Sequence, residues 1–292
     1  MKKMFARQLQ QTLSRQILEG RSDIYNEQEA QQIAQILLEY FLHLTHNDIL
    51  LNKQKEINLQ DEYQLNTAIS RLLKDEPVQY ITGEAYFYGR PFYVSPSVLI
   101  PRRETEELTH LIISENKKSG LHVLDIGTGS GCIAITLAKE LHQSHVHALD
   151  VSTEALAVAK ANARRHQAEL GWHLNNVLQD TPLPEMPIDI VVSNPPYVRE
   201  SEAAEMQNNV LAYEPATALF VSDENPLIYY EQIIKMCLNS GFLSADAKVY
   251  FEINEFLGEQ MMELFARYNM QNTVLQRDMQ EKNRFIKANF PN

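Results

Sequence analysis

The chain begins with apolar side chains repeated at helical spacing over residues 5–74. Leu9, Leu13 and Ile17 recur at every fourth position. Polar pairs that mark helix starts interrupt this pattern, because one side chain can cap the backbone three residues further on. These signals are Asn26 with Glu29, Thr45 with Asp48, and Asp61 before the stripe of Leu65, Ala68, Ile69 and Leu72. The pattern predicts a small all-α domain of four or five helices over residues 1–76.

Residues 77–100 have a different composition, rich in aromatic and turn-forming residues. Alternation of large side chains between glycines and prolines is typical of short antiparallel strands. The residues that carry it are Tyr80, Tyr86, Phe87, Tyr88, Phe92 and Tyr93, with Gly83, Gly89, Pro91 and Pro96. We expect a β-hairpin that links two domains.

From residue 101 to 292, short β-branched runs alternate with helical patterns. Such alternation predicts an α/β domain with a mostly parallel, doubly wound sheet. The expected strands cover 123–125, 146–150, 174–178, 188–192, 248–253, 273–276 and 284–288, and the expected helices after the first strand cover 132–141, 153–166, 227–238 and 257–268. Residues 198–225 form a long connection with little regular pattern, and connections of this length are often functional. We expect them to be a lid that orders over a substrate.

The stretch from Ser193 to Tyr197 follows the buried strand 188–192 and reads Ser-Asn-Pro-Pro-Tyr. Its prolines end the strand, which places Asn194 at the carboxyl end of a parallel strand, where open α/β sheets bind ligands. Asn194 Oδ1 and the Pro195 carbonyl oxygen are two acceptors, and Tyr197 adds an aromatic face. This set suits a planar amino or amide group. Alone, the stretch is equally consistent with a plain turn.

A glycine-rich loop follows the first strand of this domain. Asp125 precedes Gly127, Gly129 and Gly131, whose spacing differs from that of pyrophosphate-binding loops. Asp150 ends the second strand, where its carboxylate would accept hydrogen bonds from both hydroxyls of a ribose. Taken singly, Asp125 or Asp150 is equally well explained as a helix cap or a solvated loop residue. In this order they favour a cationic nucleoside such as S-adenosylmethionine, with Asp180 placed to meet the adenine amino group.

Composition and charge narrow the classes of function. The 292 residues carry a net charge of −12, of which residues 1–100 contribute −2 and residues 101–292 contribute −10. An acidic catalytic domain argues against stable nucleic-acid binding. Two cysteines and the absence of a long apolar run favour a reducing, cytoplasmic setting without a membrane span. Two histidine groups, His43 with His46 and His142, His145 with His147, lack the company expected of a metal site, so no metal is expected.

The chain resembles the release-factor glutamine N5-methyltransferase family (PrmC/HemK) of class I S-adenosylmethionine-dependent methyltransferases. The resemblance runs nearly end to end and rests on five groups of matching residues. These are 77–84 (Pro-Val-Gln-Tyr-Ile-Thr-Gly-Glu), 98–102 with 104–106 (Val-Leu-Ile-Pro-Arg with Glu-Thr-Glu), 125–134, 193–198 and 213–215 (Tyr-Glu-Pro). The Asn-Pro-Pro-Tyr motif is shared with enzymes that methylate adenine or guanine amino groups, so the helical domain and the linker make the match specific to the family.

The resemblance implies a Rossmann-like, seven-stranded methyltransferase domain whose last strand is antiparallel. It also implies a helical domain that docks the protein substrate, and methyl transfer to the glutamine of the Gly-Gly-Gln loop of peptide chain release factors, leaving S-adenosylhomocysteine. The expected catalytic residues are Asn194, Pro195 and Tyr197, and Pro196 joins them in binding the substrate. The expected cofactor contacts are Asp125, Gly127, Thr128, Gly129, Ser130, Gly131, Asp150, Asp180, Thr181 and Asn194.

Three positions depart from the family pattern. Arg103 stands where proline is usual, Thr181 stands where an aromatic residue often follows the acidic position, and residues 220–226 lack the usual glycines. None of the three departures falls in the stretch that contains Asn194.

Two other functions remain open on the sequence. One is an N6-adenine or N2-guanine nucleic-acid methyltransferase, which predicts a basic groove and salt-sensitive binding. The other is a cofactor-sensing binding protein of the translation machinery. That reading predicts loss of the chemical residues, whereas Asn194 to Tyr197 are intact.

Overall fold

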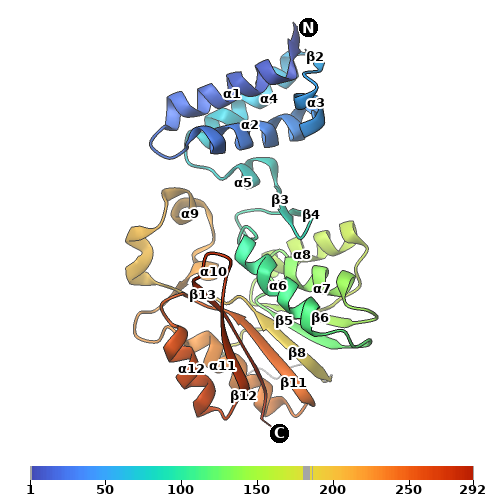
Figure 1. Cartoon of the computed structure of the whole chain (residues 1–292), viewed down its shortest axis with the longest axis vertical. Helices are drawn as coiled ribbons and strands as arrows, with labels where there is room; N and C mark the ends of the chain where they lie inside the picture. The colour runs from blue at the N-terminus through green and yellow to red at the C-terminus, as the bar shows by residue number, and fades with distance from the viewer. Residues whose placement is uncertain (1, 180–184, 186, 292) are drawn as a thin grey trace. The chain divides into compact units, whose positions relative to one another are not determined.

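The computed structural model describes residues 2–179, 185 and 187–291 of the chain (Figure 1). The described residues form two compact units. The smaller unit comprises residues 1–83 with 207–213, and the larger comprises residues 84–206 with 214–292. None of the helices in the described part is long and apolar enough to cross a lipid bilayer.

The smaller unit is a helical bundle around one apolar core. Leu13, Ile17, Leu37 and Leu72 are almost fully buried in this core, as the four-residue spacing predicts. Its helices are α1 (Ala6–Arg21), α2 (Glu27–Leu42), α3 (His46–Leu50), α4 (Leu59–Leu72), α5 (Val78–Thr82) and α9 (Asn208–Tyr213).

Helix capping in this unit follows the sequence signals, with one correction. Asn26 and Thr45 form complete capping boxes at the starts of α2 and α3. The α4 cap is Asn58, whose Oδ1 accepts from the backbone of Gln60 and Asp61. The prediction that Asp61 is the cap was therefore wrong by one turn, because Asp61 is the reciprocal partner inside the box.

Two structural features of residues 1–83 differ from the all-helical prediction. Strands β1 (Lys2–Phe5) and β2 (Gln54–Ile57) pair as an antiparallel ribbon. Both are four residues long and mostly exposed, so no alternation of buried side chains marks them in the sequence. Part of the expected hairpin linker also forms the short helix α5 (Val78–Thr82).

The hairpin itself is confirmed in the larger unit. Strands β3 (Glu84–Phe87) and β4 (Arg90–Tyr93) pair antiparallel around Tyr88 and Gly89. Both turn residues have positive φ, +50° and +72°, as a tight two-residue hairpin with native strand twist requires.

A seven-stranded sheet organises the larger unit, as expected. Its order is β12-β13-β11-β8-β5-β6-β7, and β13 is antiparallel to both of its neighbours. The prediction of a parallel sheet with an antiparallel last strand is thus confirmed. The strands are β5 (His122–Ile126), β6 (His145–Asp150), β7 (Gly171–Leu174), β8 (Ile188–Ser193), β11 (Leu243–Glu252), β12 (Gln271–Arg277) and β13 (Asn283–Asn289).

Helices cover both faces of this sheet and produce two apolar cores. One core joins the sheet to α11 (Ile228–Ser240) and α12 (Gly258–Arg267). The other joins the opposite face to α6 (Arg103–Glu115), α7 (Cys132–Glu140) and α8 (Thr153–His166). Adjacent strand residues alternate between the cores, for example Val191 and Val192 of β8. The result is a three-layer α/β/α domain (Figure 1).

Two segments of the larger domain differ from the sequence prediction. The third strand lies at Gly171–Leu174 instead of 174–178, because this edge strand is half-buried and lacks a strong apolar pattern. The connection 198–225 contains short elements of two to six residues, too short for periodicity to reveal. They are β9 (Val198–Arg199), a 3₁₀ turn (Glu200–Glu205), α9, α10 (Ala216–Leu219) and β10 (Phe220–Val221).

Candidate active site

Four parallel strands end at one edge of the sheet, where the chemistry-bearing residues gather. β5 ends at Ile126, β6 at Asp150, β8 at Ser193 and β11 at Glu252. Ile126 pairs with Ser193, and the Ser193 hydroxyl donates to the Ile126 carbonyl oxygen at 2.6 Å. This edge therefore joins the glycine loop after β5 to the Asn-Pro-Pro-Tyr stretch after β8, as expected for a ligand site in an open sheet.

The glycine loop turns sharply between β5 and α7. Gly127, Gly129 and Gly131 have φ of +75°, +54° and +80°, a region that favours glycine. A Cβ atom on Gly127 or Gly129 would meet nothing within 4 Å, so their backbone faces open space. Gly131 is different, since a Cβ there would lie 3.1 Å from Ala159 Cβ. The first two glycines leave room for a ligand, whereas the third permits α7 and α8 to pack closely.

Asp125 holds the loop from inside the protein. It is fully buried, and its Oδ2 accepts from Thr128 Oγ1 at 2.7 Å and from the Ala134 amide at 3.2 Å. Burial raises the pKa of Asp125 to about 7. Among the described residues, its buried Oδ1 has no hydrogen-bond partner. An unpaired carboxylate oxygen beside the loop suits a positively charged ligand or a bridging water.

Asp150 connects the loop to the second strand. Its Oδ2 accepts from the Gly129 amide at 2.8 Å, and its Oδ1 accepts from the Ser152 amide at 2.9 Å. Burial raises the pKa of Asp150 above its ordinary value. Each carboxylate oxygen retains a second lone pair, so two further donors such as ribose hydroxyls can be accepted.

Ser130 and Thr128 complete the described part of the loop. Thr128 and Ser130 are both buried, and the Ser130 carbonyl oxygen accepts from Asn162 Nδ2 at 2.8 Å. The Asn162 amide also exchanges hydrogen bonds with the backbone of Tyr93, 3.0 Å to its carbonyl oxygen and 2.6 Å from its amide. Asn162 therefore ties the loop to strand β4. The expected adenine contacts, Asp180 and Thr181, lie outside the described residues.

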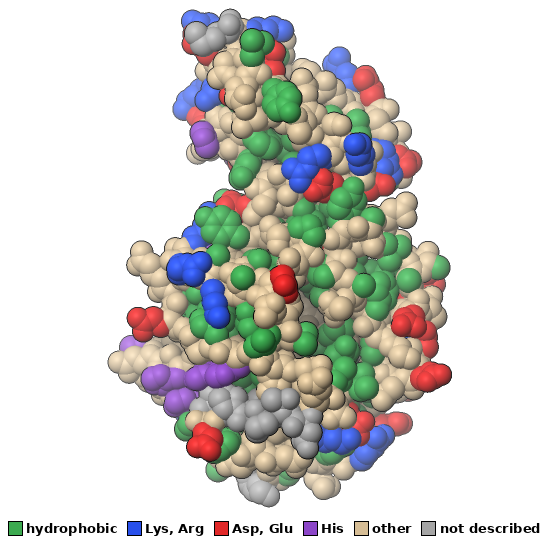
Figure 2. All heavy atoms as spheres, turned by 180° about the vertical axis from the view of Figure 1, so that it is seen from behind, with side chains coloured by type: hydrophobic (Ala, Val, Ile, Leu, Met, Phe, Trp, Pro, Cys, Tyr) green, Lys and Arg blue, Asp and Glu red, His purple; other side chains and the backbone are tan. Residues whose placement is uncertain are grey.

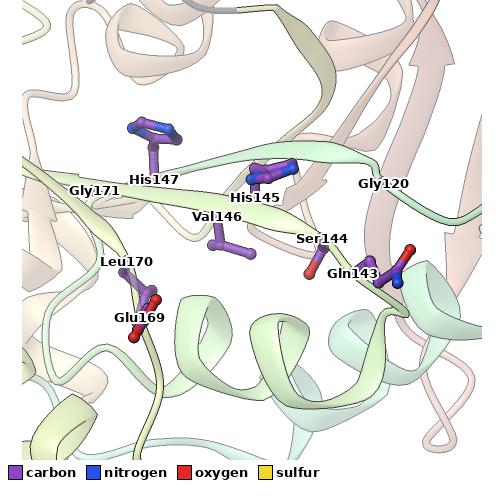
Figure 3. A pocket seen from close by; sticks show the side chains of 9 residues that line it. All are labelled: Gly120, Gln143, Ser144, His145, Val146, His147, Glu169, Leu170 and Gly171. Carbon is purple, nitrogen blue, oxygen red and sulfur yellow. The ribbon is translucent and has the colours of Figure 1, made fainter.

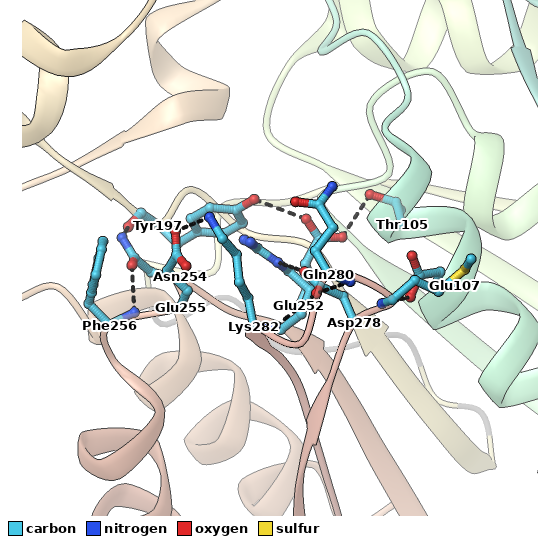
Figure 4. A network of polar contacts seen from close by, with 12 residues as sticks. Thr105, Glu107, Tyr197, Glu252, Asn254, Glu255, Phe256, Asp278, Gln280 and Lys282 are labelled. Carbon is cyan, nitrogen blue, oxygen red and sulfur yellow. Dashed lines mark hydrogen bonds and ion pairs between the residues drawn. The ribbon is translucent and has the colours of Figure 1, made fainter.

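Asn194 and Tyr197 are linked through two residues that sequence reasoning did not single out as functional. Asn194 Nδ2 donates to Thr105 Oγ1 at 3.1 Å, and Thr105 Oγ1 donates to Glu252 Oε2 at 2.7 Å. The Tyr197 hydroxyl donates to Glu252 Oε1 at 2.9 Å. Figure 4 shows Thr105 and Tyr197 both directed at the Glu252 carboxylate. This chain of hydrogen bonds connects α6, β8 and β11.

The signals for these two residues were present but weak. Glu252 is a charged residue inside the otherwise apolar run 249–253, and Thr105 is the middle residue of the Glu-Thr-Glu stretch at 104–106. Thr105 and Asn194 are 89 positions apart, and Thr105 and Glu252 are 147 apart. No local pattern reports contacts at such separation.

Pro195, Pro196 and Tyr197 shape the surface next to Asn194. Pro195 is buried, whereas Asn194, Pro196 and Tyr197 are partly exposed. Burial of its hydroxyl end, followed by the charge of Glu252, raises the pKa of Tyr197 well above its ordinary value, so the phenol stays neutral. Within the described residues, neither Asn194 Oδ1 nor the Pro195 carbonyl oxygen accepts a hydrogen bond. Both oxygens can therefore accept from a ligand.

Two sequence motifs of unassigned role meet beside α6. Glu214 accepts from the Ile100 amide at 3.2 Å and from Arg102 Nη2 at 2.5 Å, and its side chain is 1% exposed. Arg102 is the residue before α6, and Arg103 occupies the first helical position. Proline is favoured there but not required, so the departure at Arg103 leaves the helix start in place.

The glycine-poor segment 220–226 also has a structural role. β10 pairs parallel with β9, and Asp223 accepts from the Ser201 amide at 3.0 Å and from its hydroxyl. The stretch after Tyr197 is thereby joined to residues more than twenty positions further along the chain.

A separate pocket lies at the opposite ends of the strands (Figure 3). Its lining includes Gly120, His145 and Gly171, at or just before the starts of β5, β6 and β7. It contains none of the expected catalytic or cofactor residues, and we assign it no part in the chemistry.

Histidines gather on one surface of this unit (Figure 2). His122 stacks on His145 with ring centroids 4.7 Å apart, and His147 stacks on His173 at 5.1 Å. Burial and neighbouring imidazoles lower the pKa of His147. Across the described ranges, no three His, Cys, Asp or Glu side chains are arranged to hold a metal ion.

Comparison with known proteins relates both units to characterised sequences. Residues 15–83 match the family model described as PrmC N-terminal domain, and residues 102–220 match the one described as Methyltransferase small domain. A release factor glutamine methyltransferase of Flavobacterium psychrophilum is 43% identical over 94% of this chain and 97% of its own length. The chain belongs to the release factor glutamine methyltransferase family.

A second relative agrees with the first in extent. The release factor glutamine methyltransferase of Bacteroides thetaiotaomicron is 40% identical over 94% of this chain and 97% of its own. Among solved structures, a methyltransferase from Pyrococcus furiosus covers 77% of this chain and 98% of its own, with a TM-score of 0.47 and 14% identity.

Proposed function

We propose that this protein transfers a methyl group from S-adenosylmethionine to the side-chain amide nitrogen N5 of the glutamine in the Gly-Gly-Gln loop of peptide chain release factors. The observation that carries the proposal is the pair of acceptors beside Tyr197. Asn194 donates through Nδ2 to Thr105, so its Oδ1 is left to accept from a ligand together with the Pro195 carbonyl oxygen. This matches a primary carboxamide, which has two N–H groups on one nitrogen.

The residues after β8 act by positioning. A carboxamide nitrogen is a poor nucleophile because its lone pair is delocalised into the carbonyl group. Asn194 Oδ1 and the Pro195 carbonyl oxygen each accept one N–H, which orients the nitrogen and favours the pyramidal geometry of attack. The ring of Tyr197 forms an aromatic wall and helps to exclude water. A general base is not required before transfer, since the proton leaves the nitrogen afterwards.

The loop residues fit the cofactor. S-adenosylmethionine, when bound, supplies an electrophilic methyl group on a sulfonium. Gly127 and Gly129 give its amino-acid portion room to approach the backbone, and Asp150 accepts from its ribose hydroxyls. The unpaired Oδ1 of Asp125 adds negative charge beside a cation once the carboxyl group ionises, which its raised pKa of about 7 places near neutral pH. We assign Thr128, Ser130 and Gly131 to shaping this loop, and Asp180 and Thr181 to the adenine end.

We assign the two units different tasks. The helical unit docks the release factor, the hairpin joins it to the catalytic unit, and residues 198–225 close over the glutamine as a lid. The activity belongs in the cytoplasm, where peptide chains are terminated. Methylation of adenine or guanine is the second candidate, because the Asn-Pro-Pro-Tyr stretch suits any planar amino group. The net charge of −10 on residues 101–292 disfavours it, since phosphate contacts need basic side chains.

The test combines substrate identity with one variant. The protein is incubated with S-adenosylmethionine and unmethylated release factor, and mass gain is mapped by peptide, with DNA and RNA in parallel reactions. We expect one methyl group on the Gly-Gly-Gln glutamine, and a rate lower by about two to four powers of ten for Asn194→Ala. Near-normal turnover of that variant would overturn the role of Asn194. Label on adenine or guanine alone would replace the proposed substrate.

A further inference from the structure

The hydroxyl of Thr105 lies between a carboxylate and an amide, and it has one proton to give. Thr105 Oγ1 is 2.7 Å from Glu252 Oε2 and 3.1 Å from Asn194 Nδ2. An ionised carboxylate only accepts hydrogen bonds, so the Thr105 proton is directed at Glu252. The lone pairs of Thr105 then face Asn194, and only the NH₂ end of the Asn194 amide can bond to them.

This arrangement decides which end of a nearly symmetric group meets the substrate. The oxygen and nitrogen ends of an asparagine amide have almost the same shape, so packing alone does not distinguish them. With Nδ2 held by Thr105, Oδ1 is presented as an acceptor. In the reversed orientation, Asn194 would present N–H groups to the N–H groups of the substrate, and no hydrogen bond would form.

We propose that Glu252, acting through Thr105, sets the direction of the Asn194 amide and thereby makes it an acceptor for the substrate nitrogen. Glu252 and Thr105 are positioning residues, and the inference rests on the proposed function for its consequence in catalysis. Both residues lie outside the Asn-Pro-Pro-Tyr motif.

The surroundings of Glu252 hold its carboxylate in one orientation. Its Oε1 accepts from the Tyr197 hydroxyl at 2.9 Å, and its backbone carbonyl oxygen accepts from Tyr230 at 3.0 Å. Thr109, one turn further along α6, donates to the backbone carbonyl oxygen of Thr105 at 2.8 Å and not to its hydroxyl. Glu252, Tyr230, Thr105 and Thr109 are all buried. Both carboxylate oxygens thus have a hydroxyl donor, and no rotation of Glu252 is needed to satisfy them.

Protonation of Glu252 would remove the directing effect, because a protonated carboxyl can donate to Thr105. Burial raises the pKa of Glu252, while the two hydroxyl donors and the positive charge of Arg284 oppose this. The polar and charged groups that face it are Thr105 and Glu104 from α6, Tyr197 after β8, Tyr230 from α11 and Arg284 from β13. On acidification we therefore expect the Asn194 amide to lose its fixed orientation, and kcat to fall.

The decisive comparison uses three substitutions in one helix. Thr105→Val keeps the shape and removes the hydroxyl, Thr105→Ser keeps the hydroxyl, and Thr109→Val removes a buried hydroxyl one turn away. We expect kcat to fall between about tenfold and a hundredfold for Thr105→Val, as when groups that orient metal ligands are removed. The KM for release factor and the Kd for S-adenosylhomocysteine should change less than about twofold, because Thr105 is buried and is proposed to act only through Asn194. Thr105→Ser should restore most of kcat, and Thr109→Val should resemble the unaltered protein.

A second readout does not depend on turnover. The Asn194 side-chain NH₂ is assigned by ¹⁵N NMR in the intact, unsubstituted protein, and its hydrogen exchange is measured. A proton held by Thr105 should exchange at least about tenfold more slowly than in exposed asparagines, and this protection should disappear on acidification or in Thr105→Val.

The outcomes separate this inference from the proposed function. If the unaltered protein methylates no release factor, the proposed function fails, and the NH₂ protection alone then supports or overturns the direction of the amide. If methylation occurs but Thr105→Val turns over like Thr109→Val, the inference is overturned while the function stands. An unprotected Asn194 NH₂ in the unsubstituted protein overturns it even if Thr105→Val does not fold.

Discussion

Arg102 and Glu214 are 112 positions apart, yet the guanidinium of one donates to the carboxylate of the other at 2.5 Å. The Glu214 side chain is almost completely buried, and Arg102 immediately precedes the helix that carries Thr105. The pair therefore fixes the start of α6 to the interior of the connection 198–225, which follows the active-site stretch. The same ion pair therefore contributes to the stability of the fold and to the position of the helix whose Thr105 bonds Asn194.

Loss of one partner should be costly. Arg102→Ala leaves a buried carboxylate without its counter-charge, and we expect the free energy of unfolding to fall by about 3 kcal/mol. Urea denaturation can be followed through the fluorescence of Trp172, the single tryptophan. The double variant with Glu214→Gln should recover part of this loss because the uncompensated charge is gone. Equal denaturation midpoints for the Arg102→Ala protein and the unaltered protein would contradict the prediction.

Two glycines of the loop should respond differently to alanine. Gly131→Ala places a Cβ against Ala159 at a φ of +80°, so it should destabilise the fold by about 2 kcal/mol or more. Gly129→Ala has open space and should cost only about 1 kcal/mol for its backbone conformation. Its main effect should be on cofactor affinity, weakened by about tenfold or more, equivalent to ~1.4 kcal/mol. Calorimetric titration with S-adenosylhomocysteine measures this, and unchanged affinity would place the cofactor elsewhere.

Asp125 should make stability depend on pH. Its pKa is raised to about 7 in the folded protein, whereas in the unfolded chain it lies at about 4. The folded state therefore holds its proton more tightly. The stabilisation is complete below about pH 4, is lost as the pH rises to about 7, and amounts to roughly 4 kcal/mol across that window.

Asp125→Asn isolates this contribution from that of other buried carboxyls. An amide keeps an acceptor for Thr128 and Ala134 but does not ionise. The stability of Asp125→Asn relative to the unaltered protein should rise between pH 4 and pH 7, and urea midpoints at several pH values measure it. A difference that is the same at pH 5 and pH 7.5 would show that Asp125 does not titrate in this range.

The lid should become protected when both ligands are present. Glu200 and Glu205 are exposed in the connection 198–225, and Glu169 is exposed outside it. With S-adenosylhomocysteine and release factor bound together, we expect a Glu-specific protease to cut at Glu200 and Glu205 about tenfold more slowly, a ~1.4 kcal/mol rise in the free energy of opening. Cleavage after Glu169 serves as the internal control. Equal rates with and without ligands would argue against a lid.

Local signals in the sequence were enough to place most of the catalytic fold. Helix α8 begins at Thr153 and ends at His166, as the periodic apolar pattern and its last-turn basic residues indicate. Strand β7 was misplaced because an edge strand is covered on few sides and needs no apolar run. The ribbon of β1 and β2 was missed for a related reason, since its pairing joins two short, mostly exposed segments far apart in the chain.

The candidate site also contains residues that local sequence features predict and residues that they do not. Glycines at positive φ and an asparagine before two prolines are local features, so position and spacing predict them. Glu252 and Thr105 gain their roles from hydrogen bonds that exist only after α6, β8 and β11 have packed together. The role of each residue depends on its hydrogen-bond partner. A glutamate at the end of a strand does not reveal from the sequence which side chain will bond to it.

The side-chain amide of Asn162 connects the hairpin to the glycine loop. One side chain bonds the backbone of Tyr93 on one side and the carbonyl oxygen of Ser130 on the other. The hairpin therefore cannot change length at its β4 strand without displacing the loop. Insertions are tolerable at the Tyr88–Gly89 tip, whereas a single-residue deletion between Pro91 and Tyr93 would shift the register against α8. The segment that looks like a flexible tether between domains is constrained at one end as tightly as a catalytic element.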